Sequence, residues 1–350
     1  MGRSIIIATT QMDVTPAPLS ERLARAEKLV TQSGQAGARL IVLPEVFNTG
    51  YTYRDENFIL AELPDGPTAT WMKQISARLG VHLAGSILLR DGQDIYNALL
   101  LCAPDGRCWR YDKNYPWGWE RGYFRGHRQI TIANTDLGDI GLLLCWDVAH
   151  AGLWQQYAGK IDLMLVCSCP PNIPEAIYHF PDGLQVTANQ MGPLYARLRQ
   201  SARRVFEDTP AQQTAWLGVP YVSSTACGTF HSPLPNPAGS FLGFLPTAPW
   251  LIRHLPQIRK TEVSASLVEA ACIFTADGLL LARLRNEQGE AFALAEVSLP
   301  AERQQPRTLQ PRPPVPWLVY LASDRLLVMT SLRTYARRNI NIQKDGVSSG

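Results

Sequence analysis

The sequence has 350 residues, of which 46% are apolar and 18% are charged, and this composition is typical of a globular chain with a substantial core. The net charge of +3 is too small to indicate a nucleic-acid-binding groove or a membrane-binding surface. No stretch approaches the about 18 consecutive apolar residues that span a bilayer, and the apolar run at 5–8 is too short for a signal peptide, so we expect a cytoplasmic protein.

Short apolar runs bounded by turn residues predict buried strands. They are 4–9, 38–43, 81–89, 95–102, 140–144, 163–167, 221–224 and 270–274. Helical patterns occupy 21–33, with Ser20 as the expected N-cap, and 67–79, with a stop at Gly80; a longer helix is expected over 194–207. Asp-Gly pairs at 91–92, 105–106 and 277–278 predict hairpins. This mixture of strand–helix units and hairpins indicates sheets covered by helices.

The C-terminal part has a different composition. Residues 300–316 are rich in Pro, Gln and Arg and predict an extended linker. Beyond the linker, 317–350 form an extension in which 317–338 have the pattern of one basic amphipathic helix. Asp324 and Arg325 interrupt its apolar stripe, so docking onto protein, including a neighbouring subunit, is favoured over an anionic membrane.

The seven cysteines have no spacing that indicates a disulfide framework in a chain of this length. Cys167 and Cys169 are not a CxxC pair, and the six histidines lack the paired spacing of a metal site. We therefore expect a reduced protein that uses no metal and no cofactor.

Three residues lie at strand ends or in loops, where catalytic side chains are commonly found. Considered alone, however, each of them is better explained by an ordinary structural role. Glu45 follows a strand and Pro44, but a loop glutamate is usually solvated. Lys113 lies among aromatic residues, where a lysine usually makes cation–π or snorkelling contacts. Cys145 ends an apolar strand before a helix, a place that favours a thiolate, but most cysteines are small buried hydrophobes.

Together, however, their order and separations resemble the nitrilase superfamily of carbon–nitrogen hydrolases. The resemblance extends from about residue 4 to 299, which we take as one catalytic domain (1–299). It is carried by LPEVFNTGY at 43–51, YDKNYPWGWERGYFRG at 111–126 and GLLLCWD at 141–147, with weaker matches at 219–228 and 274–278. The resemblance implies a four-layer αββα sandwich and a homodimer or larger homo-oligomer.

The resemblance also implies roles. Cys145 would be the nucleophile, Glu45 the general base, and Lys113 the cation that stabilises the oxyanion. Glu120 would be the second glutamate, which positions substrate and polar groups. A free thiol is only slightly ionised at neutral pH, which explains why the nucleophile needs a base and a nearby ammonium.

Further residues surround this set. The backbone N–H of Trp146 is expected as a second oxyanion donor. Tyr51, Trp119, Trp117, the Trp146 ring and His150 either form an aromatic substrate wall or are ordinary packing residues; the sequence does not separate these alternatives.

The substrate remains open between two classes. The sequence Cys-Trp-Asp at 145–147 is commoner among amidases and carbamoylases, whereas the spacing of Lys113 and Glu120 resembles nitrilases. We therefore expect a hydrolase of a non-peptide amide or carbamoyl bond that forms a thioester, with a nitrile hydrolase as the alternative. An acyltransferase and a non-catalytic binding protein on the same fold rank lower.

Overall fold

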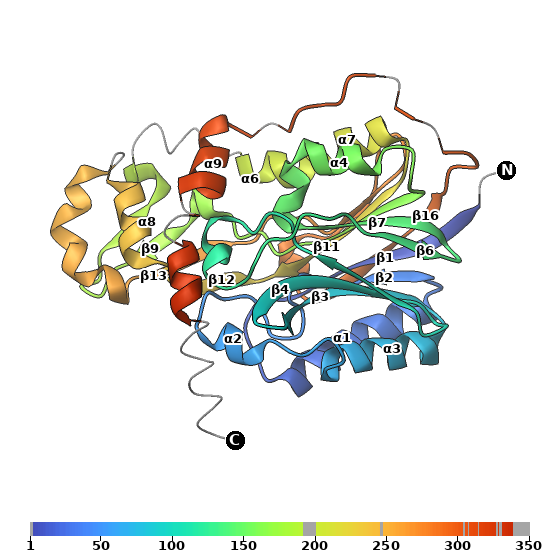
Figure 1. Ribbon diagram of the computed structural model, residues 1–350, viewed down its shortest axis with the longest axis horizontal. Helices are drawn as coiled ribbons and strands as arrows, with labels where there is room; N and C mark the ends of the chain where they lie inside the picture. The colour runs from blue at the N-terminus through green and yellow to red at the C-terminus, as the bar shows by residue number, and fades with distance from the viewer. Residues whose placement is uncertain are drawn as a thin grey trace.

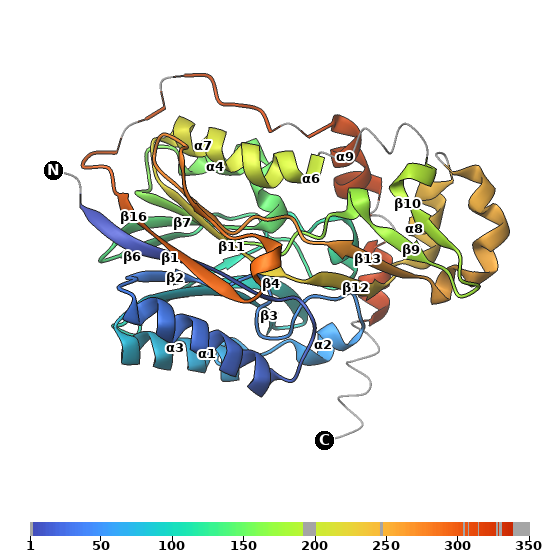
Figure 2. The same cartoon turned by 180° about the vertical axis from the view of Figure 1, so that it is seen from behind.

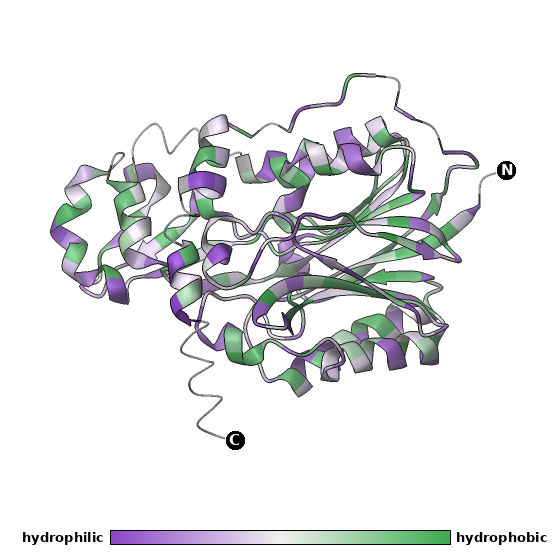
Figure 3. Cartoon of the chain, in the orientation of Figure 1, coloured by the Kyte–Doolittle hydropathy of each residue, from purple (hydrophilic) through white to green (hydrophobic). Residues whose placement is uncertain are grey.

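The computed structural model describes residues 3–338 except 192–200, 246–247, 304, 307, 314, 327 and 329–330. These residues form a mixed α/β fold in which the two halves of a 12-stranded sheet face each other and helices cover the outer faces (Figure 1). The order helix, sheet, sheet, helix confirms the expected αββα sandwich. Apolar residues concentrate on the strands between the helical layers (Figure 3).

The first half of the sheet comes from the N-terminal part of the chain. Its elements are β1 (Ser4–Asp13), α1 (Leu19–Gln35), β2 (Leu40–Val42), α3 (Pro67–Leu79), β3 (His82–Asp91), β4 (Asp94–Cys102) and β5 (Cys108–Asp112). β1, β2 and β3 are parallel, whereas β4 and β5 continue the sheet as antiparallel hairpins. α1 buries Ala26, Leu29 and Val30, and the left-handed Gly80 (φ 66°) ends α3 as expected.

The second half follows in the chain and carries the opposite helical layer. Its elements are β6 (Ile132–Thr135), β7 (Gly138–Leu144), α4 (Ala151–Tyr157), β8 (Leu163–Cys167), α7 (Thr209–Leu217), β11 (Tyr221–Cys227), β14 (Cys272–Phe274), β15 (Leu280–Arg283) and β16 (Ala291–Ser298). β7, β8 and β11 are parallel, and β11 pairs in parallel with β1, which joins the two halves. The carboxyl ends of these strands meet at one edge, where open α/β sheets place reactive groups.

A small lobe beside the sandwich was not predicted. Its elements are η3 (Ile173–Glu175), β9 (Ile177–His179), β10 (Gln185–Thr187), η4 (Ala188–Met191), β12 (Thr229–Pro233), α8 (Pro237–Phe244), η6 (Pro249–Lys260) and β13 (Glu262–Ser266). The four strands form a sheet in the order β10-β9-β13-β12. Tyr178, Phe230, Phe241 and Val263 join its core to aromatic residues of the sandwich. Strands this short lack a clear alternating pattern, which is why the sequence did not indicate them.

After β16 the chain crosses the helical layer in extended form, as seen from both sides (Figures 1 and 2). It is tied to α7 by hydrogen bonds from Trp216 Nε1 to the carbonyl of Thr308 (3.1 Å) and from Gln213 Nε2 to that of Pro311 (2.6 Å). α9 (Trp317–Leu321) and the π-helical η8 (Ala322–Leu326) follow, and residues 331–338 are helical. Every described residue of 317–338 is thus α-helical or π-helical.

Two further expectations differ from the structure. α1 begins at Leu19 and not after Ser20, because Pro18 already supplies a φ (−53°) suited to helix entry. Cys102 and Cys108 form a disulfide, which the expectation of a fully reduced protein missed. The two cysteines are opposite partners in the β4–β5 hairpin, so the strand register brings them within bonding distance.

Half of the helix expected over 194–207 lies outside the described residues. The described half is helical: α6 (Ser201–Arg203) is followed by the π-helical η5 (Arg204–Asp208). Two other short helices are α2 (Glu56–Leu60) and η7 (Asn286–Gln288). Across the described ranges, no helix is long and apolar enough to cross a membrane.

Candidate active site

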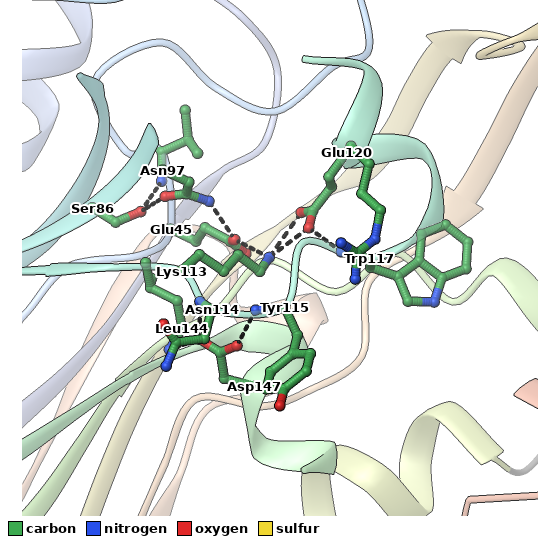
Figure 4. A network of polar contacts seen from close by, with 12 residues as sticks. Glu45, Ser86, Asn97, Lys113, Asn114, Tyr115, Trp117, Glu120, Leu144 and Asp147 are labelled. Carbon is green, nitrogen blue, oxygen red and sulfur yellow. Dashed lines mark hydrogen bonds and ion pairs between the residues drawn. The ribbon is translucent and has the colours of Figure 1, made fainter. Parts of the chain in front are cut away.

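Glu45 lies in the turn that follows β2 and is almost completely buried. The turn is strained at the next residue, because Val46 has a φ of 51°. Asn97 on β4 donates from Nδ2 to Glu45 Oε1 at 2.8 Å, and Ser86 Oγ on β3 donates to Asn97 Oδ1 at 2.9 Å (Figure 4). Ser86 Oγ also accepts the Val46 N–H at 2.9 Å. Two neighbouring strands thereby fix the orientation of the Glu45 carboxyl group.

The sequence analysis did not single out Ser86 or Asn97. Each is a fully buried polar residue within a strand whose neighbours are mostly apolar. A polar side chain in such a place must find a hydrogen-bond partner, because leaving it unpaired would cost about 1–3 kcal/mol. The need of these two buried side chains for hydrogen-bond partners was therefore the feature of the sequence that could have indicated a polar site beside the two strands.

Lys113 follows β5 and lies between two carboxylates. Its Nζ is 2.7 Å from Glu45 Oε1 and 2.7 Å from Glu120 Oε2, and the side chain has no exposed surface (Figure 4). Burial lowers the pKa of Lys113, but the charges of Glu120 and Glu45 outweigh it and hold that pKa well above the usual value. The site therefore contains a permanently charged ammonium group.

Glu120 lies on the short 3-10 helix η1 (Gly118–Gly122) and is buried. Its Oε2 accepts the backbone N–H of Trp117 at 2.6 Å, and its Oε1 accepts the hydroxyl of Tyr51. Tyr51 OH is in turn 3.0 Å from Tyr53 OH. These contacts leave Glu120 with its carboxylate directed at Lys113.

Cys145 is the first residue of η2 (Cys145–Ala149), directly after β7. Its φ of 46° lies in the left-handed region, which is costly for a residue with a side chain and is a feature of functional sites. Cys145 is 6% exposed, and its thiol lies close enough to the Glu45 carboxyl group to influence the pKa of Glu45. The structure thus brings together Glu45, Lys113, Glu120 and Cys145 from four separate segments.

The thiol and Glu45 form a coupled proton site. Burial raises the pKa of Cys145 well above its usual value; Glu45 adds to this increase and Lys113 opposes it. Burial also raises the pKa of Glu45, against the lowering effect of Lys113. Burial disfavours both the thiolate and the carboxylate, so the pair holds one negative charge beside Lys113, and passing the thiol proton to Glu45 moves that charge without creating a second one. This arrangement is suited to a thiol that ionises only during attack.

Asp147 connects the Cys145 turn to the Lys113 loop. Its Oδ1 accepts the backbone N–H of Tyr115 at 2.7 Å; its Oδ2 accepts the hydroxyl of Tyr111 at 2.7 Å and the N–H groups of Asn114 and Leu144, each at 3.3 Å (Figure 4). Burial raises the pKa of Asp147 to about 6, although Lys113 lowers it. In the sequence, Asp147 indicated only the class of substrate, whereas in the structure it also holds the two loops together.

The predicted wall residues lie at two places. Trp119 donates from Nε1 to Ser240 Oγ of the small lobe at 2.8 Å, and its ring is T-shaped against Trp117 with centroids 5.3 Å apart. Together with Tyr51, whose hydroxyl donates to Glu120, these rings line the side of the site that is nearest the small lobe. They connect the lobe to the polar centre.

His150 and Trp146 lie on the other side. His150 stacks on Tyr115 with centroids 3.6 Å apart, and Trp146 is T-shaped against His150 at 6.1 Å. Burial, with Arg121 nearby, lowers the pKa of His150 to about 3, so this ring is neutral. The stacked pair supports the Lys113 loop through packing.

A sequence profile of the carbon-nitrogen hydrolase family matches residues 6–307 of the chain. A nitrilase from Pyrococcus abyssi is 29% identical over 145 residues, which are 40% of this chain and 55% of that protein. A chloroplastic omega-amidase from Arabidopsis thaliana is 27% identical over 284 residues, which are 75% of this chain and 68% of that protein.

Two solved structures share the fold. A CN-hydrolase superfamily protein from Xanthomonas campestris superimposes with a TM-score of 0.60 at 17% identity, covering 85% of this chain and 91% of that chain. An amidase of the nitrilase superfamily from Nesterenkonia gives a TM-score of 0.59 at 16% identity, covering 85% and 92%. At this level of identity, the similarity concerns the fold.

Proposed function

The chain belongs to the carbon–nitrogen hydrolase family, and on this premise we propose that it hydrolyses a non-peptide amide or carbamoyl bond through a thioester on Cys145. The observation that carries the proposal is Lys113, held 2.7 Å from each of two buried glutamates, together with the Cys145 thiol, whose pKa depends on the charges of Glu45 and Lys113. A thiol, a base and a fixed cation are the parts that nucleophilic acyl transfer requires.

The first half of the reaction forms the thioester. Glu45 takes the proton of Cys145 as the sulfur attacks the carbonyl carbon, and the carbonyl oxygen becomes an oxyanion. Lys113 Nζ and the N–H of Trp146 stabilise that charge; a donor of this kind contributes about 3–4 kcal/mol to the transition state. Glu45 then transfers its proton to the leaving nitrogen, the carbon–nitrogen bond breaks, and ammonia or an amine departs.

The second half restores the enzyme. Glu45 removes a proton from water, the oxygen attacks the thioester carbon, and a second oxyanion forms at the same donors. Collapse of this intermediate breaks the carbon–sulfur bond, and the thiolate recovers its proton from Glu45. Asn97 holds Glu45 in place during both steps, and Glu120 does the same for Lys113.

An amide substrate is favoured over a nitrile by the extent of the similarity. The match to the omega-amidase covers 75% of this chain, compared with 40% for the match to the nitrilase. Hydrolysis of a nitrile with the same residues is the alternative. Matched amide and nitrile pairs with the same acyl group separate the two: ammonia release from the amide alone supports our proposal, and release from the nitrile with no amide turnover overturns it.

Trapping of the acyl group tests the chemistry directly. A Glu45→Gln variant keeps the shape of the side chain but removes the base, so an acyl group that reaches Cys145 from a reactive ester should persist as a thioester. Intact-mass analysis should show one added acyl group, and peptide mapping should place it on Cys145. An adduct on another cysteine, or none, would contradict the thioester intermediate.

We also propose that the protein acts in the cytoplasm as a homodimer or larger homo-oligomer that takes small-molecule substrates. The support is the family membership, in combination with the absence of a membrane-spanning helix from the described residues. Light scattering of the full chain at several concentrations tests the assembly, and a monomer throughout would overturn that part of the proposal.

A further inference from the structure

The C-terminal extension returns to the two turns that carry Cys145 and Glu120. In Figure 1, α9 and the helical piece that follows lie between the sandwich and the small lobe, and both views place them there (Figures 1 and 2). Within the described residues, η8 contacts η1, the turn of Glu120. The proposed mechanism above does not use this segment.

The segment contacts the Cys145 turn through Tyr320. The Tyr320 hydroxyl donates to the carbonyl oxygen of Ala149, the last residue of η2, at 2.5 Å. Its ring also lies 6.2 Å from that of Trp146 and 5.5 Å from that of His150. A single side chain of the extension thus contacts the end of the helix that begins with the nucleophile.

The same segment contacts the Glu120 turn further along. Ser331 Oγ donates to the carbonyl of Gly118 at 3.4 Å, and Arg338 Nη1 donates to that of Gly122 at 2.9 Å. These two carbonyls belong to the first and last residues of η1. The Arg338 guanidinium also lies 4.2 Å above the ring of Tyr123.

Asp324 lies between the two turns and faces a residue of each. Its Oδ1 is 3.5 Å from Arg121 Nη2, on the residue after Glu120, and its Oδ2 is 3.6 Å from His150 Nε2, on the residue after η2. Ser323 Oγ donates to Asp324 Oδ1 at 2.9 Å and orients the carboxylate. Asp324 and Arg121 are each only 16% exposed, so solvent screens their attraction less than at a surface pair.

Tyr335 anchors the segment in the core. It has no exposed surface, its hydroxyl accepts the N–H of Ile95 at 3.0 Å, and it donates to Asp94 Oδ1 at 2.9 Å. Its ring packs against Phe58 with centroids 5.8 Å apart. A segment anchored this way is held in one position and can restrain what it touches.

We propose that the described residues of 317–338 form an intrachain strap that holds the Glu120 turn against the Cys145 turn, with Asp324 as its positioning residue. The proposal rests on the proposed function, since it concerns the geometry of that site. Asp324 acts through its ion pair with Arg121 and touches no reacting atom. Glu120 is one of two carboxylates that hold Lys113, so displacement of its turn moves the cation away from the oxyanion. Small displacements of this kind cost about 10- to 100-fold in rate.

The test compares Asp324→Asn with Arg325→Ala in the full-length chain. Arg325 is the next residue, exposed, and makes none of these contacts, so its variant controls for changes in the segment itself. We measure kcat and KM on an amide that the wild-type enzyme turns over, together with deuterium exchange in the backbone of residues 118–124. In D324N, kcat should fall about tenfold with little change in KM, and exchange should rise; R325A should match the wild type.

Two further measurements keep the outcomes distinct. The rate at which iodoacetamide labels Cys145 reports on the site without any substrate, and it should change in D324N even if no amide is found to be turned over. Thermal unfolding establishes that D324N is folded. If D324N is folded and its deuterium exchange, its Cys145 labelling rate and its kcat are all unchanged, the strap is overturned. If the wild type turns over no amide but the labelling rate of Cys145 changes in D324N, only the proposed function is overturned.

Discussion

Asp147 Oδ1 accepts the backbone N–H of Tyr115 at 2.7 Å, and this contact joins the turn of Cys145 to the loop of Lys113. The other oxygen of Asp147 accepts the N–H of Leu144, on the residue before Cys145. The distance between nucleophile and cation is therefore set by one carboxylate that lies outside the reacting set. A substitution at Asp147 should therefore change the rate of the reaction, although the Asp147 side chain contacts no reacting atom.

Replacement of Asp147 by Asn tests this relationship. The amide presents an N–H₂ group where the carboxylate accepts several hydrogen bonds, so at least one buried N–H loses its partner. The expected cost in the free energy of unfolding is about 1–3 kcal/mol. The kcat should fall by more than tenfold while KM changes little. Denaturant unfolding and steady-state kinetics measure the two effects; unchanged kcat would show that the two loops are held by other contacts.

The same residue predicts a pH dependence of stability. Burial raises the pKa of Asp147 from 3.8 to about 6, so the folded state binds its proton more tightly than the unfolded state. Its contribution to stability is therefore complete below pH 3.8 and is lost as pH rises through 6, by about 3 kcal/mol. Between pH 4 and pH 7, the free energy of unfolding of the wild type should fall by this amount relative to that of the Asp147→Asn variant. Parallel stability curves for the two proteins would contradict the shift.

Replacement of Cys145 by Ala should reduce turnover to the level measured without enzyme and leave the fold intact. The reason is that no other group can form the thioester. Cys227→Ala is the matched control, because Cys227 is also a buried free cysteine but ends β11. Ammonia release and circular dichroism are the measurements. Substantial turnover in the Cys145 variant would contradict the mechanism.

Replacement of Lys113 by Met should lower kcat about 10²- to 10³-fold, with a smaller change in KM. Met fills a similar volume but leaves two buried carboxylates without their cation. These must protonate or repel each other, so the midpoint of thermal unfolding should also fall. If KM alone changed, Lys113 would bind a charged group of the substrate and would not stabilise the oxyanion.

Asn97→Ala should lower kcat by about tenfold, because Glu45 loses the donor that orients its carboxyl group. Ser86→Ala should show a smaller effect in the same direction, since Ser86 acts on Glu45 only through Asn97 and the Val46 N–H. The order of the two variants in kcat is the informative result. A larger loss in S86A than in N97A would mean that the backbone of the turn, and not the carboxyl group, is the part being held.

Much of the architecture could be predicted from sequence, because long apolar runs and clear turn residues mark the strands and helices of the sandwich. The helix at 67–79 with its stop at Gly80 is an example of a pattern with a local physical cause. The grouping of Glu45, Lys113, Glu120 and Cys145 followed from the resemblance to a family. Neither periodicity nor composition indicated that these four segments meet.

The remaining features depend on tertiary contacts. Ser86 and Asn97 are polar residues within apolar strands, and their role becomes evident only from the hydrogen bonds that run from Ser86 to Asn97 and from Asn97 to Glu45. The disulfide between Cys102 and Cys108 depends on hairpin register, which no cysteine spacing reveals. The return of the C-terminal segment to η1 is a long-range contact made by residues such as Ser331, for which a local pattern carries no information.

The left-handed backbone at Cys145 has a consequence for how this protein tolerates change. A residue with a side chain pays a conformational penalty there, and glycine would relieve it. A chain with glycine at position 145 should therefore withstand heat better than one with alanine, while both are inert. A thiol at this position therefore carries a conformational cost that glycine would avoid, and such a loss of robustness is expected where a side chain is held for reaction.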